Sequence, residues 1–321
     1  MKRYVVHRLL QLIPILLGIT LLSFGVMYVA GGDAVSAVLA NTGSGASAEA
    51  VAAKRHELGL DRPFLVQYGT WLWGLCTGDM GTSYVSGKDV FATFASKLPA
   101  TIVLTASSVV ATVVIAVPLG IYAAVRQNRF SDCLIRACSF VGNSLPNFFV
   151  ALLLLLVFSV GLGWFPVISS GLGGSGSLVG PGLVLPTATL AIAMASKYVR
   201  QIRATVLDEL GKPYVQGARS RGIAERFVLF KNVLRSCLVM IVTLLALSIG
   251  DLLGGTAIVE TIFQWDGVGK LAVDSITMYD YPLIQAYVAW MAIIYVVVNL
   301  VADLLYHWLD PRVRLGTVDA A

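Results

Sequence analysis

Residues 100–125 read ATIVLTASSVVATVVIAVPLGIYAAV, a run of 26 residues without a charged side chain. A helix that crosses a bilayer needs about 20 mainly apolar residues. The whole chain has the same bias, because 57% of its 321 residues are hydrophobic and only 13% are charged. Soluble domains carry about 25% charged residues, and disordered chains combine low hydrophobicity with high net charge. The composition therefore predicts an all-α, polytopic membrane protein.

Five further segments are apolar enough to be spans: Leu9–Ala30, about Cys133–Trp164, about Leu185–Tyr198, about Leu234–Val259 and Leu283–Leu305. The first could be a signal peptide. Its apolar run is longer than the usual stretch of about 7–15 residues and no clear cleavage site follows, so we expect a retained helix. In the segment Cys133–Trp164, Pro146 favours a break or kink because proline lacks the backbone donor. We expect six transmembrane helices, with five or seven as the alternatives.

The placement of the basic residues predicts the orientation. Six spans put both termini on one side, and that side then holds 17 of the 23 Lys and Arg residues. Cytoplasmic loops carry such an excess, so we expect both termini in the cytoplasm. The net charge of +5 is therefore no sign of nucleic-acid binding.

The spans divide the chain into four expected regions. Residues 1–30 form the N-terminal tip and first span, 31–99 an external loop subdomain, 100–309 the transmembrane core, and 310–321 a cytoplasmic tail. In the external region, Ser47 can cap a helix that continues to about Leu58, where Gly59 supplies a stop. Inside the core, residues 206–232 form a basic, helix-compatible cytoplasmic loop. None of these regions is large enough to be an ATPase.

The sequence contains partial matches to nucleotide-binding motifs, but neither these nor its Cys and His residues predict a cofactor or metal site. Gly171–Gly176 matches G-x-G-x-x-G, but it fills a short outer loop between two apolar spans instead of a strand-to-helix turn. Gly267–Lys270 resembles a P-loop fragment that lacks the first glycine and the final Ser or Thr. The four cysteines and three histidines show no metal-ligand spacing. We therefore expect no cofactor or metal bound by this chain, with Asp251 as a weak metal candidate.

Polar residues within the spans are the candidates for a substrate path. An acid inside a span usually faces a cavity or a partner, so Asp251 either lines the path or makes a structural hydrogen bond. Asn143 and Ser144, beside the expected break at Pro146, are the other pathway candidates. Gly250 and Gly254 form a GxxxG pair, which allows close helix packing in lipid.

The basic cytoplasmic loop holds the candidates for contact with a partner. A basic loop alone would satisfy the positive-inside rule. Ala218 and Gly222, however, fall one helical turn apart and would give a helix a small, approachable face that a groove on another protein could accept. The candidate contact residues are Tyr214, Gln216, Gly217, Ala218, Arg219, Arg221, Gly222 and Glu225.

This loop resembles the E-A-A-x-x-x-G motif of binding-protein-dependent ABC importer permeases. Segments along almost the whole chain are similar to the dipeptide, oligopeptide and nickel subgroup: 58–63, 78–84, 144–148, 259–263, 267–269, 280–282 and 310–314. Gln216 and Gly217 depart from the motif, a proline expected after Arg235 is absent, and Asp266 stands where the subgroup usually has proline.

The resemblance implies a type I ABC importer permease fold and a non-enzymatic pore subunit. It implies a second, similar permease, two cytoplasmic ATPases that bind ATP and Mg, and an outer solute-binding protein in a bacterial inner membrane. Residues 212–226 would be the coupling helix that docks into an ATPase and switches the pore by alternating access. An ion-gradient-driven secondary transporter is the competing class; it would need no coupling helix.

The substrate is less well defined by the sequence. The subgroup handles di- and oligopeptides, nickel and chelated metals. The stretch Tyr68–Trp73 and the acid Asp251 resemble nickel-type permeases more than peptide-type ones. The sequence therefore favours nickel or a metal chelate slightly over a peptide.

Overall fold

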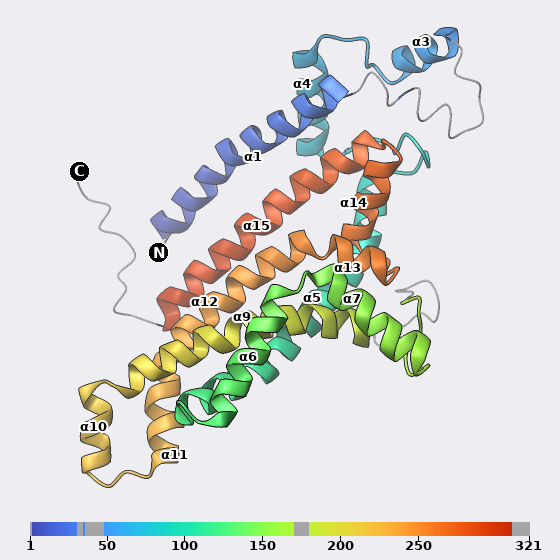
Figure 1. Ribbon diagram of the computed structural model, residues 1–321. Coiled ribbons are helices and arrows are strands. Elements are labelled where there is room, and N and C mark those ends of the chain that lie inside the picture. Colours follow the sequence, from blue (N-terminus) through green and yellow to red (C-terminus); the bar gives the residue numbers. More distant parts are fainter. Residues whose placement is uncertain (1, 31–34, 36–47, 170–179, 310–321) are drawn as a thin grey trace.

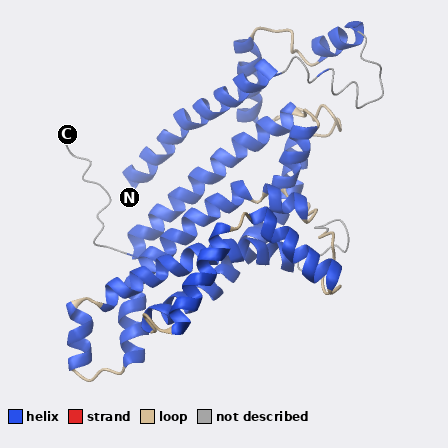
Figure 2. Cartoon of the chain, in the orientation of Figure 1, coloured by secondary structure: helices blue, strands red, loops and turns tan. Residues whose placement is uncertain are grey.

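The computed structural model describes residues 2–30, 35, 48–169 and 180–309, and this part of the chain is helical (Figures 1 and 2). Within it there is no strand, and Thr82 and Asp89 form an isolated bridge. The all-α fold is therefore confirmed. The helices are α1 Lys2–Ala30, α3 Ala48–Glu57, α4 Phe64–Thr77, α5 Val90–Val125, α6 Phe130–Ser144, α7 Asn147–Leu154, η1 Leu155–Gly161, α9 Pro181–Leu210, α10 Pro213–Ser220, α11 Glu225–Phe227, η2 Val228–Val233, α12 Leu234–Gly255, α13 Ala257–Ile262, α14 Val268–Thr277 and α15 Tyr281–Leu309.

Several of these helices can cross a membrane. By length and composition, α5, α9 and the part of α15 from Tyr281 to Val301 qualify alone. The number rises to five if each of two bent pairs is one span, and α1 has a shorter apolar stretch, Ile13–Val29. The count of six spans stays a prediction.

The expected break at Pro146 is confirmed. Helix α6 ends at Ser144 and α7 begins at Asn147, and the two axes meet at 103°. Pro146 has φ −62° and ψ 142° and has no backbone N–H to continue the ladder of α6. The segment expected as one span at Cys133–Trp164 is thus two helices set nearly at right angles.

Two helices extend well beyond their apolar stretches. Helix α5 begins at Val90 rather than at residue 100, because the Asp89 carboxylate accepts a hydrogen bond from the Ala92 backbone N–H at 2.6 Å. Helix α9 continues past Tyr198 to Leu210. The expected bounds of the external region, 31–99, and of the cytoplasmic loop, 206–232, stay predictions.

Small residues allow the central helices to approach closely. A Cβ atom at Gly120 of α5 would lie 2.8 Å from Cγ2 of Ile202 in α9, and one at Gly142 of α6 would lie 2.2 Å from Oγ of Ser196 in α9. Around these contacts, buried side chains of α5, α9 and α12 form one core, and side chains of α5, α7, α9 and α13 form a second. From the orientation that the sequence predicts, we call the first the inner core and the end of the bundle near the second the outer end.

Helices α3 and α4 lie at the C-terminal end of α1, at the outer end of the bundle (Figure 1). Gly59 follows α3 with φ +66°, as its expected role as a stop requires; Ser47 lies outside the described residues. Tyr68 and Trp71 of α4 both pack against Phe24 of α1, with ring centroids 5.6 and 6.1 Å away. The aromatic stretch that suggested nickel thus attaches α4 to α1.

Candidate functional site

The short helix α10 lies at the end of the bundle opposite α3 and α4 (Figure 1). Pro213 begins it, which suits a first helical position where no backbone N–H is needed. Val215 and Ala218 are buried in the inner core, together with Val206 of α9 and Val228 and Val233 of η2. The inward face of α10 is therefore part of the transmembrane bundle.

Glu209, at the end of α9, provides a second attachment between α10 and the bundle, in addition to the buried face. Its Oε1 accepts a hydrogen bond from the Tyr214 hydroxyl at 2.8 Å, and its other oxygen pairs with the Lys212 ammonium group. Glu209 is itself buried. Because apolar burial and this carboxylate act together, α10 has to move with α9.

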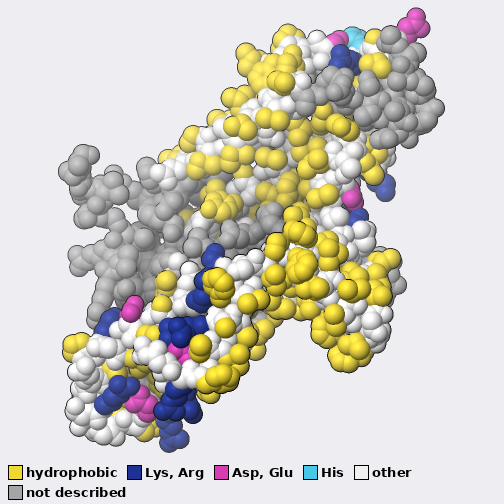
Figure 3. All heavy atoms as spheres, in the orientation of Figure 1, with side chains coloured by type: hydrophobic (Ala, Val, Ile, Leu, Met, Phe, Trp, Pro, Cys, Tyr) yellow, Lys and Arg dark blue, Asp and Glu magenta, His cyan; other side chains and the backbone are white. Residues whose placement is uncertain are grey.

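The outward face of α10 and the following turn carries most of the candidate contact residues. The exposed ones are Tyr214, Gln216, Gly217, Arg219, Arg221, Gly222 and Glu225. Arg219 donates two hydrogen bonds to Glu225, at 2.5 and 3.1 Å, and Arg221 Nε donates to the Gly217 carbonyl at 3.0 Å. Figure 3 shows Lys and Arg side chains gathered over this end of the molecule. We call residues 213–227 the inner tip.

One expectation about the inner tip needs correction. Ala218 and Gly222 do not share an exposed helical face. Ala218 is buried in the chain's own core, and the helix ends at Ser220, so Gly222 lies in the turn that follows. Gly222 has φ +73°, a conformation that glycine adopts without strain. Its role is therefore in the turn. Gly217 is the one of the two glycines that lies within α10, where a Cβ atom would meet nothing within 4 Å.

A buried ion pair links α6 to α9. Asp132 is fully buried and receives two hydrogen bonds from Arg203, at 2.7 and 2.8 Å. The Asn128 backbone N–H donates to it at 2.9 Å, and Arg136 lies at 3.4 Å. Sequence reasoning missed this pair, although Arg203 had been noted among the basic residues near the end of its span.

The pathway candidates lie in two helices. Asn143 and Ser144 are exposed at the end of α6, where the Ser144 hydroxyl donates to the Phe140 carbonyl at 2.8 Å. In α12, a Cβ atom at Gly250 would lie 3.3 Å from the Tyr295 ring of α15, so Gly250 stands at a close helix contact. Asp251 and Gly254 belong to α12, but the described side chains do not include them. Their roles stay predictions.

The block 259–270 forms a buried network at the outer end of the bundle, which sequence reasoning missed. Glu260 of α13 is fully buried. Its Oε1 accepts hydrogen bonds from the hydroxyls of Thr101 at 2.8 Å and Thr256 at 3.1 Å, and its Oε2 accepts from the Lys270 backbone N–H at 2.9 Å. A Cβ atom at Gly269 would lie 2.9 Å from that Oε2. The glycines make room for a carboxylate of the chain itself and form no nucleotide loop.

Two neighbours of this network fix it to α5. Trp265 is buried and donates from Nε1 to the Ala100 carbonyl at 3.0 Å. Asp266 pairs with Lys97 at 2.5 Å. Asp266 stands where the subgroup that the sequence resembles usually has proline, and this ion pair gives it a structural role.

A second long-range contact, which we call the outer clasp, closes the same end. Asp280 is buried and accepts hydrogen bonds from the Ser83 hydroxyl at 2.5 Å and from the Tyr84 backbone N–H at 3.1 Å. Burial and the nearby Asp280 carboxylate raise the pKa of Tyr84 to about 12. The clasp brings together two segments that the resemblance had marked separately, 78–84 and 280–282.

The described residues contain no group of three His, Cys, Asp or Glu side chains that could hold a metal ion. The inner tip, the glutamate network and the clasp instead combine packing with hydrogen bonds. Such an arrangement can hold helices rigidly and present a docking surface. At these three sites, no nucleophilic side chain lies beside a general base, as a catalytic site would require.

The fold defines the class first. The chain is similar to a permease chain in inward-facing structures of the MetNI methionine ABC transporter, with a TM-score of 0.55 and 15% identity over 68% of this chain and 96% of that chain. This likeness shows the fold of an ABC importer permease.

The sequence comparisons then define the family. Residues 116–315 match the family described as binding-protein-dependent transport system inner membrane component, and residues 1–105 match its N-terminal region. The chain belongs to this family. It is 38% identical over 314 residues to a glutathione transport system permease protein of Salmonella paratyphi A, covering 98% of this chain and 99% of that protein. It is 39% identical over 323 residues to an oligopeptide transport system permease protein of Bacillus subtilis, covering 98% and 100%.

Membership fixes the coarse function. The chain is a multi-pass inner membrane subunit of an ABC importer and not an enzyme, and it works in a membrane complex with ATPases and a binding protein.

Proposed function

We propose that this chain forms half of a translocation pore together with a second, homologous permease. Two ATPase subunits bind ATP and Mg on the cytoplasmic side, and an outer solute-binding protein delivers the substrate. ATP-driven closure of the ATPases moves the inner tip and switches the pore by alternating access. Family membership disfavours the ion-gradient-driven alternative.

The observation that carries this proposal is the two-sided construction of α10. Its inner face is buried through Val215 and Ala218, and Glu209 holds it to α9. Its outer face is exposed and rich in polar and charged groups. A helix that is fixed to the bundle on one side and open on the other can transmit a rigid-body displacement from a docked partner to the spans.

The orientation with both termini inside is part of the proposal. On the face drawn in Figure 3, Lys and Arg side chains gather at the end of the molecule that holds the inner tip. This distribution supports a cytoplasmic position for the tip.

We further propose a peptide-class substrate in place of nickel. The two relatives described above are permeases for glutathione and for oligopeptides. The aromatic stretch that favoured nickel packs α4 onto α1, as Tyr68 and Trp71 show. Asp251 is then the one remaining ground for a metal.

The test uses Gly217→Trp in the complete importer. Gly217 is exposed within α10, and a Cβ atom there meets nothing within 4 Å, so the chain can accept the bulk while the docking face cannot. We expect peptide uptake and binding-protein-stimulated ATP hydrolysis to fall by about tenfold or more, since loss of a central interface contact costs roughly 2 kcal/mol or more. Uptake of a labelled tripeptide and of Ni²⁺ is measured in parallel in proteoliposomes.

The matched control is Gln127→Trp, which adds the same bulk at an exposed turn between α5 and α6 at the same end of the molecule. It should transport normally. Wild-type uptake by Gly217→Trp would contradict docking through α10. Uptake of Ni²⁺ without uptake of the tripeptide would contradict the substrate class and leave the docking result standing.

A further inference from the structure

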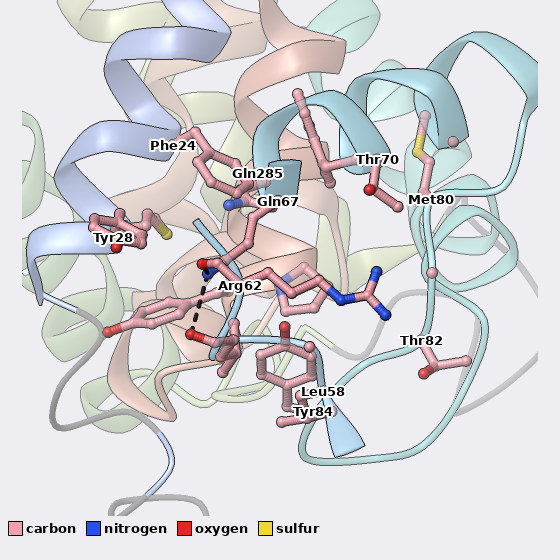
Figure 4. Close-up of a pocket in the computed structure, with 18 of the residues that line it drawn as sticks. Phe24, Tyr28, Leu58, Arg62, Gln67, Thr70, Met80, Thr82, Tyr84 and Gln285 are labelled. Atoms are coloured by element: carbon pink, nitrogen blue, oxygen red, sulfur yellow. Dashed lines mark hydrogen bonds between the residues drawn. The ribbon is translucent and has the colours of Figure 1, made fainter. Parts of the chain in front are cut away.

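A cavity of about 740 Å³ lies at the outer end of the molecule. It is enclosed by the end of α1, residues 55–62, α4, residues 79–84 and the start of α15 (Figure 4). Its volume falls in the range of about 300–1,000 Å³ that is typical of small-molecule sites. The inner tip, which the proposed function uses, lies at the opposite end of the bundle.

The cavity lies where lipid headgroups meet the protein. Its lining includes Phe24 and Tyr28 near the end of the apolar stretch of α1, and Tyr281 and Gln285 in the first turns of the apolar helix α15. The ends of two membrane-crossing segments mark the interface between hydrocarbon and water. Tyrosine and tryptophan side chains, which are enriched at that depth, also line the cavity.

The cavity opens beside an apolar surface. Val29 lines it and is 87% exposed, and Val26 and Leu22, one and two turns back along α1, are 61% and 70% exposed. A ligand with a polar head and an apolar tail can therefore fill the cavity and lie along α1 at once. A peptide without such a tail would use only the polar half of this surface.

Arg62 supplies the polar recognition. Gln67 donates hydrogen bonds to the carbonyls of Leu60 at 3.1 Å and Arg62 at 2.7 Å, so the backbone that carries Arg62 is held in place. The guanidinium group extends across the cavity toward Met80 and Thr82, as Figure 4 shows. Among the described residues it makes neither a hydrogen bond nor an ion pair. Arg62 is exposed at the cavity, and a guanidinium group in that position is suited to a phosphate.

Acidic groups balance this charge. Asp79 and Glu57 line the same cavity, together with Arg55 and Arg62. Asp79 already accepts a hydrogen bond from the Gly81 backbone N–H at 3.0 Å, which fixes its carboxylate. Arg62 and Asp79 together favour a ligand that carries both signs.

We propose that this cavity binds the headgroup of a zwitterionic phospholipid. The phosphate pairs with Arg62, the ammonium group of an ethanolamine faces Asp79, and the acyl chains run along the exposed apolar face of α1. The bound lipid fills the space between α1, α4 and α15, and so stabilises α1 against the bundle.

The test measures how much phospholipid the complete importer retains. The importer is reconstituted in phosphatidylethanolamine nanodiscs and transferred into detergent, and the bound lipid is measured by native mass spectrometry. Arg62→Gln should retain the phospholipid about tenfold less well, because a charge-assisted contact is lost. Arg62→Lys should keep most of it, and Lys88→Gln, an exposed basic residue outside the cavity, should match wild type. Equal retention by wild type and Arg62→Gln would overturn the proposal.

Two further arms identify the ligand. Thr70→Trp fills the cavity and should also lose the lipid; full retention there would place the lipid elsewhere and overturn the assignment. Glycerophosphoethanolamine, inorganic phosphate and a tripeptide are then compared as competitors. Displacement best achieved by glycerophosphoethanolamine supports the headgroup, whereas displacement best achieved by either of the other two overturns it.

Discussion

At the scale of single residues, the outer network shows what its glycines are for. A Cβ atom at Gly269 would lie 2.7 Å from Cα of Ala257, which is backbone and cannot move aside alone. Gly217 in the inner tip is also a helical glycine, yet a Cβ atom there meets nothing within 4 Å. The same substitution at these two positions should therefore act in opposite directions.

We expect Gly269→Ala to lower the free energy of unfolding by about 1–3 kcal/mol, because the added methyl group forces α13 and α14 apart. Gly217→Ala should raise it by about 0.5–1 kcal/mol, since alanine loses less conformational freedom in a helix. Thermal unfolding of the purified protein in detergent measures both. A melting temperature for Gly269→Ala equal to that of Gly217→Ala would refute the packing role.

At the scale of elements, Asp132 and Arg203 determine how α6 sits on α9. Asp132 is fully buried and Arg203 nearly so, whereas Arg136 is half exposed and 3.4 Å away. Removing one member of a buried pair leaves an uncompensated charge, which costs far more than losing an exposed partner.

Asp132→Asn should therefore destabilise the protein by about 3 kcal/mol, and Arg136→Gln by less than about 1 kcal/mol. Adding Arg203→Met to Asp132→Asn should recover part of the loss, because the unpaired cation is then removed. Thermal unfolding of wild type, of these variants and of Arg203→Met alone gives the comparison. A double variant as unstable as the sum of its single variants would show that the two residues act independently.

At the scale of the whole molecule, the inner tip and the outer clasp occupy opposite ends of the bundle (Figure 1). The proposed orientation puts the tip in the cytoplasm and the clasp outside. Ser86, next to the clasp, and Gln127, in the turn between α5 and α6, are both exposed and so report on the two sides.

In a variant whose native cysteines are replaced by alanine, Ser86→Cys should react with a membrane-impermeant maleimide in intact spheroplasts. Gln127→Cys should react only after the membrane is permeabilised. The mass increase of the purified protein measures both reactions. The opposite pattern would reverse the orientation of the chain in the membrane.

The features that could be predicted from the sequence are those that depend on residues close together along the chain. Apolar run length predicted the helical membrane class, and Pro146 predicted its own break, because both act within one helical turn or segment. The early start of α5 at Val90 required recognising Asp89 as a cap. The burial of Ala218 depends on η2 and α9, so local spacing alone could not show it.

The hydrogen-bond partners of the buried acids could not be predicted either, because they lie far away along the chain. Glu260 meets Thr101 across 159 positions, and Asp280 meets Ser83 across 197. Motif resemblance marked these segments as important without showing that they touch. The aromatic residues Tyr68 and Trp71 show the converse, because their contact with α1 gives them a packing role where the sequence suggested a substrate preference.

The outer clasp joins two segments that are synthesised at different times. Ser83 leaves the ribosome 197 residues before Asp280. Because bacterial-type synthesis adds about 5–20 residues per second, the outer segment waits roughly 10–40 s for its partner. In the proposed orientation, residues 78–89 stand outside the membrane during that interval without the contact that later holds them. The outer clasp can therefore close only after Asp280, late in the chain, has been synthesised.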